Sequence, residues 1–376
     1  MHLARDVSVW AILLANNFIY ALWDVVAREV FNVNMDVLPP TVFICIRNTF
    51  AALVAFLIAA LFEGPVPWLE KQKSEKKQYS RKGLWACMAL HGNVTPENVA
   101  TKLITCAFLF STASHVCYAE GVALTSAMHA SAMQPIIPYL SATFPVLGSR
   151  RKTSSGGKWQ PWLGVVSVIC SLFLLMPAPS PQTVEEAQMK SELQQGDVLL
   201  LPAMIGSSVS LKMEGSFLLI ISAVSWTCSL ILQHRLLQVM KPAWLVFTMF
   251  LLAAPQTALL AFALSQSQAF SWPEVSYSLC FGMIFSVFAG VISGGSTAWA
   301  LRNGHGTKVQ IATCSHPIFT VCSSFFILGK SSPKYDLFGC MLLILGFVFS
   351  ATHRSDDGTD MAPAGFAEDY ERESLL

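Results

Sequence analysis

The sequence predicts an all-α membrane protein whose ten transmembrane helices form two inverted five-helix repeats. Three observations predict this fold class: an apolar composition, ten stretches long enough to span a bilayer, and an acidic connection that divides them five and five. Hydrophobic residues make up 53% of the 376 residues and charged residues 12%, against roughly a quarter charged in ordinary globular proteins. With a mean hydropathy of +0.52, the chain carries too few charges to cover the surface of a soluble protein of this length.

The same composition excludes several classes of protein. A net charge of +1 and a pI near 7.6 provide no basic excess for a nucleic-acid partner. Apolar residues are too abundant for a disordered chain. Most of the ten cysteines lie in apolar stretches and no CxxC pair occurs. Neither a disulfide framework nor a metal site is therefore expected, and no cofactor is predicted.

The first repeat is predicted over residues 7–177, after a short cytosolic N-terminus at 1–6. A membrane helix needs about 20 mainly apolar residues to cross roughly 30 Å of hydrocarbon. The apolar run that starts at Val7 is too long for a signal peptide and lacks a small-residue cleavage site, so it is interpreted as the first span. The five spans of this repeat are expected at about 7–28, 39–62, 99–120, 122–147 and 159–177.

A polar, net acidic connection over residues 178–214 separates the repeats and is expected on the outer side. The second repeat, over 215–352, is followed by a cytosolic tail at 353–376 that is expected to be disordered. Because five is an odd number, two such blocks cross the membrane in opposite senses, as the inverted repeats of secondary transporters do. The spans of the second repeat are expected at about 215–236, 243–264, 275–301, 307–329 and 335–352.

Lysine and arginine set the expected orientation, because the cytosolic segments of membrane proteins are enriched in them. If the N-terminus is cytosolic, the inside segments hold 18 of the 24 Lys and Arg residues and the outside segments hold five. Both termini are therefore predicted to be cytosolic. The lipid bilayer is an expected partner, and the oligomeric state is left open.

Polar side chains near the middle of the spans are the candidates for contact with a solute, because they usually face the bundle interior or a wet cavity. When Pro138 is aligned with Pro317, Gln134 and Thr313 take equivalent positions in the two repeats. Both prolines are expected to break their helices and to free a backbone carbonyl. Hydrogen bonding between helices is the alternative role for the polar residues, and packing is the alternative for the tryptophan. The predicted substrate-binding residues are Asn17, Gln134, Trp226, Gln256, Thr313 and His316.

Two charged residues lie deep in the first two spans. Arg47 lies about eight residues from the outer end of its span, and Asp24 about four residues from the same side. A neutralised pair removes most of the cost of burial, so Asp24 and Arg47 are predicted to pair as a structural lock. Attraction of an anionic solute by Arg47 is the alternative. No carboxylate is expected at the midplane, which favours facilitated diffusion or exchange over proton antiport.

A resemblance to a known family rests on four stretches and their order along the chain. They are GVALTSAMHASAMQPIIP (121–138), SWTCSLILQHRLL (225–237), the Pro242 to Gln256 segment and GTKVQIATCSHPIF (306–319). Over about 10–352 the chain resembles the plant drug/metabolite transporters of the EamA type, the nodulin-like or "walls are thin"-related group also called UMAMIT. Arg150 and Lys330 stand where that family often has glutamate. The resemblance implies transport of amino acids, auxin-like compounds or other small organic solutes.

The predicted function is that of a multi-pass transporter that moves a small-molecule solute by alternating access. A nucleotide-sugar or phosphate-ester exchanger of the same superfamily is the alternative among carriers, but such anions would require several buried cations and only Arg47 qualifies. A membrane-embedded enzyme or a receptor is the alternative outside the carriers. The sequence contains no HxxxH, no GxSxG and no acidic pair inside a span, so no catalytic residue and no enzyme activity is predicted.

The C-terminal tail carries a candidate sorting signal. It ends in Glu371-Arg372-Glu373-Ser374-Leu375-Leu376, which fits an acidic dileucine signal built on Glu371, Leu375 and Leu376. An ordinary tail is the alternative. If the signal acts, sorting adaptors are partners of the tail, and the protein is expected in the plasma membrane or the vacuolar membrane.

Overall fold

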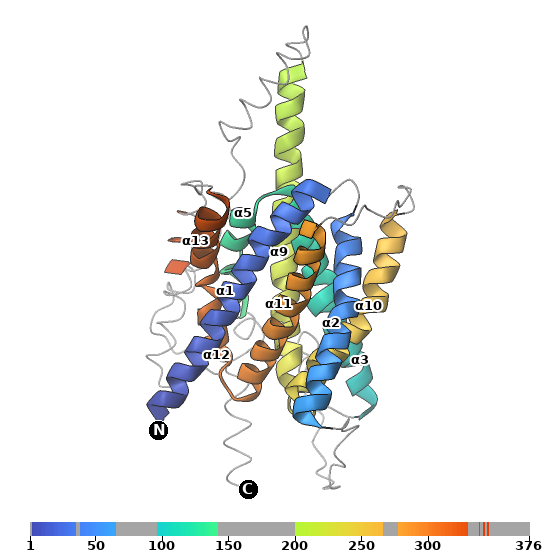
Figure 1. Ribbon diagram of the computed structural model, residues 1–376, viewed down its shortest axis with the longest axis vertical. Coiled ribbons are helices and arrows are strands. Elements are labelled where there is room, and N and C mark those ends of the chain that lie inside the picture. The colour runs from blue at the N-terminus through green and yellow to red at the C-terminus, as the bar shows by residue number, and fades with distance from the viewer. Residues whose placement is uncertain are drawn as a thin grey trace, which may run out of the picture.

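Every regular element in the described part of the chain is a helix. The computed structural model describes residues 2–34, 38–64, 96–141, 200–265 and 277–329, together with 338, 341, 342, 344 and 345. Figure 1 shows most of the helices running side by side as one bundle. The elements are α1 (His2–Asn34), α2 (Pro40–Glu63), α3 (Pro96–Ala107), η1 (Phe108–Ala113), α4 (Ser114–Leu124), α5 (Ala127–Ala132), α9 (Leu200–Leu236), α10 (Pro242–Ser265), α11 (Tyr277–Arg302), α12 (Gly306–Thr313) and α13 (His316–Leu328).

Six helical segments among the described residues are long and apolar enough to cross a membrane. They coincide with six of the predicted spans to within a few residues at each end, which confirms an all-helical membrane protein. The predicted span at 159–177 and most of the one at 335–352 lie outside the described residues, so the ten helices and the complete inverted repeat stay predictions. The six segments are Val7–Phe31, Pro40–Glu63, Val99–Leu124, Met213–Leu236, Pro242–Leu264 and Tyr277–Arg302.

Local sequence signals set the two ends of α2. Pro40 lies at the start of the helix, where its missing N–H group would have had no helical partner. After the last residue, Gly64 adopts a φ of 79°, which a residue with a side chain rarely does. Glu63 then accepts hydrogen bonds from the backbone N–H groups of Ala243 and Trp244 at 3.0 and 3.3 Å. Its carboxylate therefore stabilises the positive N-terminal end of α10.

The third span changes its helical type in the middle. α3 ends at Ala107, η1 is a turn of π-helix, and α4 continues from Ser114. A π-helical turn is wider than an α-helical one and shifts the facing of all residues that follow it. This shift sets which side of α4 faces the bundle interior, including Ser114 and Tyr118.

The fourth and ninth predicted spans are both broken helices. In the fourth, α5 is followed by a turn over 133–135 and a further helical stretch over 136–141. In the ninth, a turn at 314–315 separates α12 from α13. The interruption that the sequence predicts is therefore present in both spans.

The predicted prolines lie just after the breaks rather than at them. Pro317 is the second residue of α13 and Pro138 the third residue of the resumed helix, where N–H groups have no helical partner in any case. Neither can donate an α-helical hydrogen bond to the carbonyl four residues earlier, which belongs to Gln134 or Thr313. The Gln134 carbonyl nevertheless accepts a hydrogen bond from the Ile137 backbone at 3.0 Å. The expectation of a free carbonyl is therefore wrong at this position.

Helix α9 is longer than the sixth predicted span. It begins at Leu200, and its first part extends beyond the neighbouring helices in Figure 1. Pro202 lies in its first turn, where proline is tolerated. The last part of the connection predicted over 178–214 is therefore helical, and the earlier part lies outside the described residues.

Helices from the two predicted repeats pack against one another. α2 packs along α10, α4 along α9, and α1 along both α11 and α13. Figure 1 shows α1 and α9 running in opposite directions, and the contact of Glu63 with the start of α10 shows the same for α2 and α10. Opposite directions are what an inverted repeat requires of corresponding helices.

Polar side chains are buried inside the bundle and large apolar ones face outward. Asp24, Arg47, Asn48 and Gln233 are at most 1% exposed. This distribution is the one expected of a protein whose surroundings are hydrocarbon rather than water. The outward-facing apolar residues include Phe56, Leu57, Leu259, Phe262 and Phe288.

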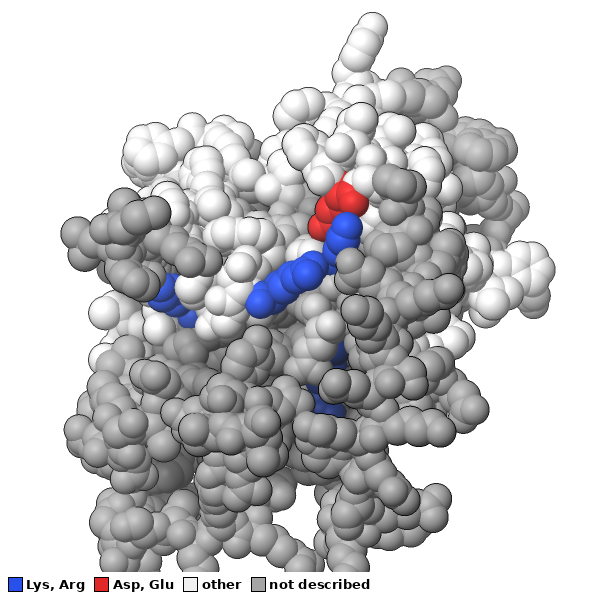
Figure 2. Space-filling view, turned by 90° about the horizontal axis from the view of Figure 1, so that it is seen from below, with Lys and Arg blue, Asp and Glu red and all other residues white. Residues whose placement is uncertain are grey.

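The end of the bundle nearest the N-terminus carries more blue than red in Figure 2. Basic side chains lie at or near the helix ends on this side, and one of them, Lys241, donates to the backbone carbonyl of Glu63 at 3.1 Å. An excess of positive charge is typical of a cytosolic face, in keeping with the predicted orientation, which itself stays a prediction. The described basic residues at these ends are Lys102, Arg235, Lys241, Arg302 and Lys308.

Candidate solute-binding site

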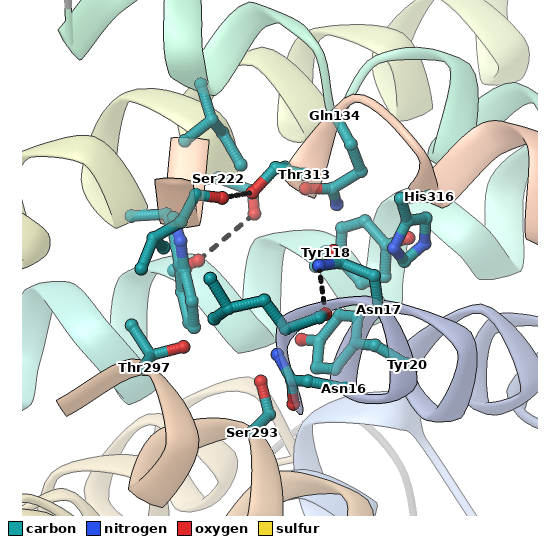
Figure 3. A pocket seen from close by; sticks show the side chains of 15 residues that line it. Asn16, Asn17, Tyr20, Tyr118, Gln134, Ser222, Ser293, Thr297, Thr313 and His316 are labelled. Atoms are coloured by element: carbon teal, nitrogen blue, oxygen red, sulfur yellow. Dashed lines mark hydrogen bonds between the residues drawn. The ribbon is translucent and has the colours of Figure 1, made fainter. Parts of the chain in front are cut away.

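A cavity lies between helices of the two predicted repeats (Figure 3). The centres of water molecules can occupy about 50 Å³ of it, which is room for a few waters. Its lining is about equally polar and apolar, and Leu13, Ile137 and Val309 are its aliphatic residues. The polar and aromatic lining residues are Asn16, Asn17, Tyr20, Ser114, Tyr118, Gln134, Ser222, Trp226, Ser293, Thr297, Thr313 and His316.

Helical spacing brings these side chains to the cavity in pairs. Residues four apart lie on the same face of an α-helix. Each of four helices therefore contributes one short polar stripe to the lining. The pairs are Asn16 and Tyr20 on α1, Ser114 and Tyr118 on α4, Ser222 and Trp226 on α9, and Ser293 and Thr297 on α11.

Five of the six residues predicted to bind substrate line this one cavity. Gln134 follows α5 at the break of the fourth span, and Thr313 ends α12 at the break of the ninth. The two equivalent positions of the proposed repeats thus face the same space (Figure 3). Asn17, Trp226 and His316 complete the set. Their contact with a solute stays a prediction.

Gln256, the sixth of these residues, does not line this cavity. It lies on α10, where its side-chain carbonyl accepts a hydrogen bond from Thr112 Oγ1 at 2.9 Å. Its amide donates to the backbone carbonyl of Ile104 at 3.4 Å. Gln256 therefore joins α10 to the third span, which is the alternative role that mid-span polar residues were expected to take.

The cavity lining offers acceptors and donors that the protein uses only in part. The amide nitrogen of Asn17 donates to the Leu13 carbonyl at 2.8 Å, which leaves its side-chain oxygen as an acceptor. Thr313 Oγ1 donates to the Val309 carbonyl at 2.9 Å and can still accept. The side-chain oxygen of Asn16 is buried and makes no hydrogen bond in the described part of the chain.

Hydroxyl and aromatic contacts join the helices around the cavity. The hydroxyls of Ser114 and Ser222 lie 3.3 Å apart and connect α4 to α9. Trp226 stacks on Phe110 with ring centroids 5.2 Å apart, and its other neighbour is His115, whose ring centroid lies 5.7 Å away. The indole is thus held by packing on one side and borders the cavity on the other, so the two roles considered for Trp226 are compatible.

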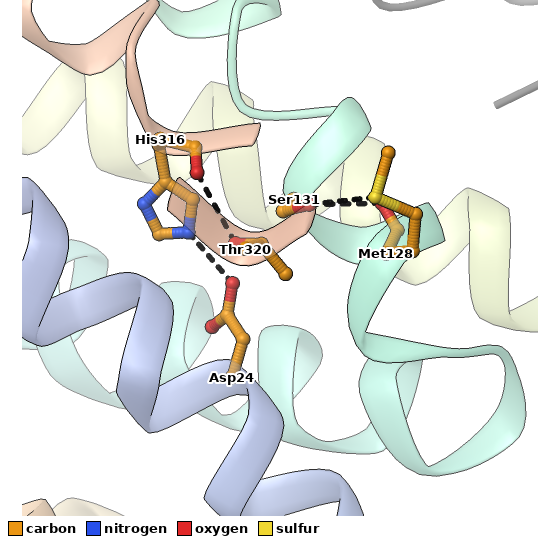
Figure 4. Close-up of polar contacts among 5 residues, drawn as sticks. All are labelled: Asp24, Met128, Ser131, His316 and Thr320. Atoms are coloured by element: carbon orange, nitrogen blue, oxygen red, sulfur yellow. Dashed lines mark hydrogen bonds and ion pairs between the residues drawn. The ribbon is translucent and has the colours of Figure 1, made fainter. Parts of the chain in front are cut away.

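His316 and Asp24 form a buried pair beside the cavity (Figure 4). Nε2 of His316 lies 2.6 Å from Oδ2 of Asp24, and the two side chains are 2% and 0% exposed. His316 is the first residue of α13 and lines the cavity, whereas Asp24 lies on α1 behind it. The ring of Tyr20 meets the imidazole edge to face at a centroid distance of 5.6 Å. The predicted partner of Asp24 was Arg47, and this pairing is wrong.

Arg47 instead lies in a cage of apolar and aromatic side chains. Its Nη2 is 3.3 Å from Nε2 of His115, and its guanidinium carbon is 6.0 Å from the centroid of the Phe250 ring. The absence of a side chain at Gly290 makes room for it on α11. Nε and Nη1 of Arg47 make no hydrogen bond in the described part of the chain. Neither Arg47 nor Asp24 lines the cavity directly.

Several lining residues escaped the sequence analysis. Tyr20 and Tyr118 are ordinary aromatic residues of apolar spans, and the serines and threonine of α9 and α11 are the residues that pack helices together in most membrane proteins. The repeated four-residue spacing of polar pairs near mid-span is the signal that could have found them.

Two further predictions concern residues or groups outside this cavity. The sorting-signal residues Glu371, Leu375 and Leu376 lie outside the described residues. Within the described residues, no group of three or more His, Cys, Asp or Glu side chains is placed to hold a metal ion.

Comparisons with known proteins agree with this architecture. A crystal structure of a protein superposes with a TM-score of 0.52 at 13% identity, covering 91% of this chain and 96% of that chain. At this identity the likeness concerns the fold alone. A comparison with curated proteins finds no match. Residues 213–352 match the model of the EamA-like transporter family. The chain is therefore an all-helical, multi-pass membrane protein that carries an EamA-like transporter domain.

Proposed function

We propose that the chain is a carrier that moves small organic solutes across a membrane by alternating access, with the cavity as its solute site. The observation that carries the proposal is the position of the cavity, which is lined by helices of both predicted repeats. Carriers built from inverted repeats bind their solutes at such an interface, beside broken helices. The EamA-like domain supports the class of protein.

The lining favours a small solute with polar and apolar parts. The amides of Asn16, Asn17 and Gln134 accept and donate hydrogen bonds, and Trp226 offers a flat apolar surface beside them. Amino acids, auxin-like compounds and other organic acids combine these features. Membership of the plant UMAMIT-type group belongs to this proposal and rests on the sequence resemblance.

The size of the cavity supports a moving site rather than a rigid pore. A volume that holds a few waters is too small for an amino acid, so the helices around it must separate before such a solute enters. The breaks at 133–135 and 314–315 supply short segments where part of a span can tilt without moving the whole helix.

The alternative of a nucleotide-sugar or phosphate-ester exchanger has less support. Such solutes carry several negative charges and call for lysine or arginine at the site, whereas no lysine or arginine lines this cavity. Among the described residues, no feature favours a membrane-embedded enzyme or a receptor, and the EamA family consists typically of non-enzymatic carriers.

Counterflow in liposomes tests the proposal. The purified full chain would be reconstituted with unlabelled solute inside, and entry of radiolabelled glutamine, aspartate, indole-3-acetic acid or a uridine-diphosphate sugar would be measured. We expect saturable counterflow of an amino acid or an organic acid. Counterflow of the nucleotide sugar alone would favour the alternative exchanger, and no counterflow of any member of the panel would contradict the proposed solute class.

Localisation and topology complete the proposal. Both termini are placed in the cytosol by the Lys and Arg bias, and the protein is assigned to the plasma membrane or the vacuolar membrane. The acidic dileucine signal at Glu371, Leu375 and Leu376 and its sorting adaptors would decide between these two membranes.

A further inference from the structure

We propose that the Asp24–His316 pair is a proton-binding site that couples movement of an anionic solute to movement of a proton. The inference rests on the proposed carrier function for its coupling, but the proton site itself is a property of the pair. It reverses the expectation of uncoupled transport, which rested on the lack of a carboxylate at the midplane.

The pair is built to bind and release one proton. At 2.6 Å, Nε2 of His316 and Oδ2 of Asp24 share a hydrogen bond that excludes water, since both side chains are buried. The other ring nitrogen, Nδ1, makes no hydrogen bond to any described residue. Because His316 lines the cavity and Asp24 does not, a proton from cavity water reaches the imidazole before it reaches the carboxylate.

The step transfers one proton and changes no other covalent bond. Before the transfer, neutral His316 donates a hydrogen bond from its Nε2–H group to the carboxylate of Asp24, and the pair carries one negative charge. A hydronium ion in the cavity then transfers a proton to Nδ1 and becomes water, and the pair becomes neutral. Release on the opposite side of the membrane returns the proton to water and restores the negative charge.

Among the described residues, the titratable and charged groups around the pair come from α1, α2, α4 and α5. Tyr20 on α1 contacts the imidazole ring, and Tyr118 on α4 lies within electrostatic reach of Asp24. Arg47 on α2, with His115 on α4 beside it, lies within electrostatic reach of Tyr20. On α5, Ser131 and Met128 lie near Thr320 of α13 (Figure 4), and His129 is bonded to Ser216 on α9. No acidic or basic side chain of α11 or α12 lines the cavity beside the pair.

The charge of the pair identifies the partner of the proton. The unprotonated pair carries one negative charge, which repels a solute carboxylate in the neighbouring cavity. Protonation of His316 makes the pair neutral and removes this repulsion. Proton and anion therefore favour each other's binding, and this coupling is reciprocal.

The pair also connects the parts of the chain that must move. Asp24 belongs to the first predicted repeat and His316 to the second, 292 residues away along the chain. Protonation changes the attraction between α1 and α13, which line one side of the cavity. The same proton that favours solute binding therefore alters the contact between the two repeats.

The first experiment requires no solute. Infrared difference spectra of the purified full chain, recorded between about pH 5 and 8, would follow the carboxylate of Asp24 and the imidazole of His316. We expect both groups to change together in one titration, and Asp24→Asn to remove the carboxylate change and shift that of the imidazole. An unchanged protonation state of both groups across this range would overturn the proton site.

The second experiment compares accumulation with counterflow in liposomes, using radiolabelled aspartate and indole-3-acetic acid. For coupling of one proton to one anion, an inward proton gradient of one pH unit accumulates the solute about tenfold. In Asp24→Asn and in His316→Gln, both of which keep a hydrogen-bonding group at the pair, the ratio of accumulation to counterflow falls to near the uncoupled level. Accumulation that is independent of the proton gradient in the unmodified protein would overturn the coupling.

Thr320→Val is the matched control. Thr320 is buried and its hydroxyl donates to the His316 carbonyl at 3.2 Å, but it cannot titrate. We expect its ratio of accumulation to counterflow to equal that of the unmodified protein. If Thr320→Val lost coupling as much as the variants of the pair do, the loss in those variants would be an effect of packing and not of the proton. Failure of all counterflow with an intact infrared titration would contradict the carrier function and leave the proton site standing.

Discussion

The two mid-span glutamines provide a direct test of the solute site. Gln134 and Gln256 are both half-buried, and both were expected to contact substrate. Only Gln134 lines the cavity, whereas Gln256 bonds Thr112 and the Ile104 carbonyl. Changing each to alanine removes the same chemical group from two structurally different places.

The expected magnitudes follow from the bonds that each change removes. A hydrogen bond to a charged group contributes about 1.5–3 kcal/mol, which corresponds to roughly ten- to a hundredfold in affinity. Gln134→Ala should therefore raise the KM for solute by about that factor at near-normal abundance. The neutral bonds of Gln256 contribute about 0.6 kcal/mol each in a membrane, so Gln256→Ala should lower stability by about 1 kcal/mol and leave KM unchanged.

The assay measures two quantities for each variant. Uptake per protein molecule in liposomes reports KM, and thermal melting in detergent reports stability. Equal KM values for Gln134→Ala and the unmodified protein would refute the placement of Gln134 in the solute site. A tenfold rise in KM for Gln256→Ala would show that the solute path follows α10 instead.

Three other predictions concern packing, topology and sorting. In Gly290→Ala the new Cβ would lie 2.6 Å from Nη2 of Arg47, so we expect a loss of about 1–3 kcal/mol in stability by thermal melting. Gly295→Ala is its control, with no atom of the described residues within 4 Å of the new Cβ, and equal melting temperatures for the two variants would contradict the clash. A tag in 178–214 should react with impermeant reagents in intact cells and Cys87 should not; labelling of Cys87 from outside would reverse the orientation. Replacing the last two leucines by alanine should move the protein from internal or vacuolar membranes toward the cell surface in microscopy, and an unchanged distribution would remove the signal.

The π-helical turn explains why facing could not be read from α-helical spacing in the third span. The wider turn over Phe108–Ala113 rotates the following residues, Ser114 and Tyr118 among them, about the helix axis. They therefore face a different side from the one that regular α-helical counting would give. No residue in this segment is a helix breaker, so the apolar pattern continues unchanged. The turn is therefore stabilised by contacts with α9 and α10 rather than by local preference.

The partner of a buried charged residue likewise could not be read from the sequence. Burial cost predicts that Asp24 has a partner, and it has one. Which partner it has depends on the position of α13. Arg47 was predicted because both residues were expected to lie near the same side of the membrane. The packed bundle separates them and brings His316 to the carboxylate instead.

Hydropathy alone was sufficient for the membrane fold, because every residue of a span contributes to its transfer into lipid whichever way it faces. The positions of six spans follow from that one-dimensional information, and the prolines near mid-span indicated the two broken helices. Five of the six residues predicted to bind substrate line one cavity, and their contact with a solute stays a prediction. Rotation of each helix about its axis and the choice of neighbour have no such local signal. They decided the exclusion of Gln256 from the cavity, the pairing of Asp24 with His316 and the enclosure of Arg47 against Gly290, because each depends on side chains brought together from distant parts of the chain.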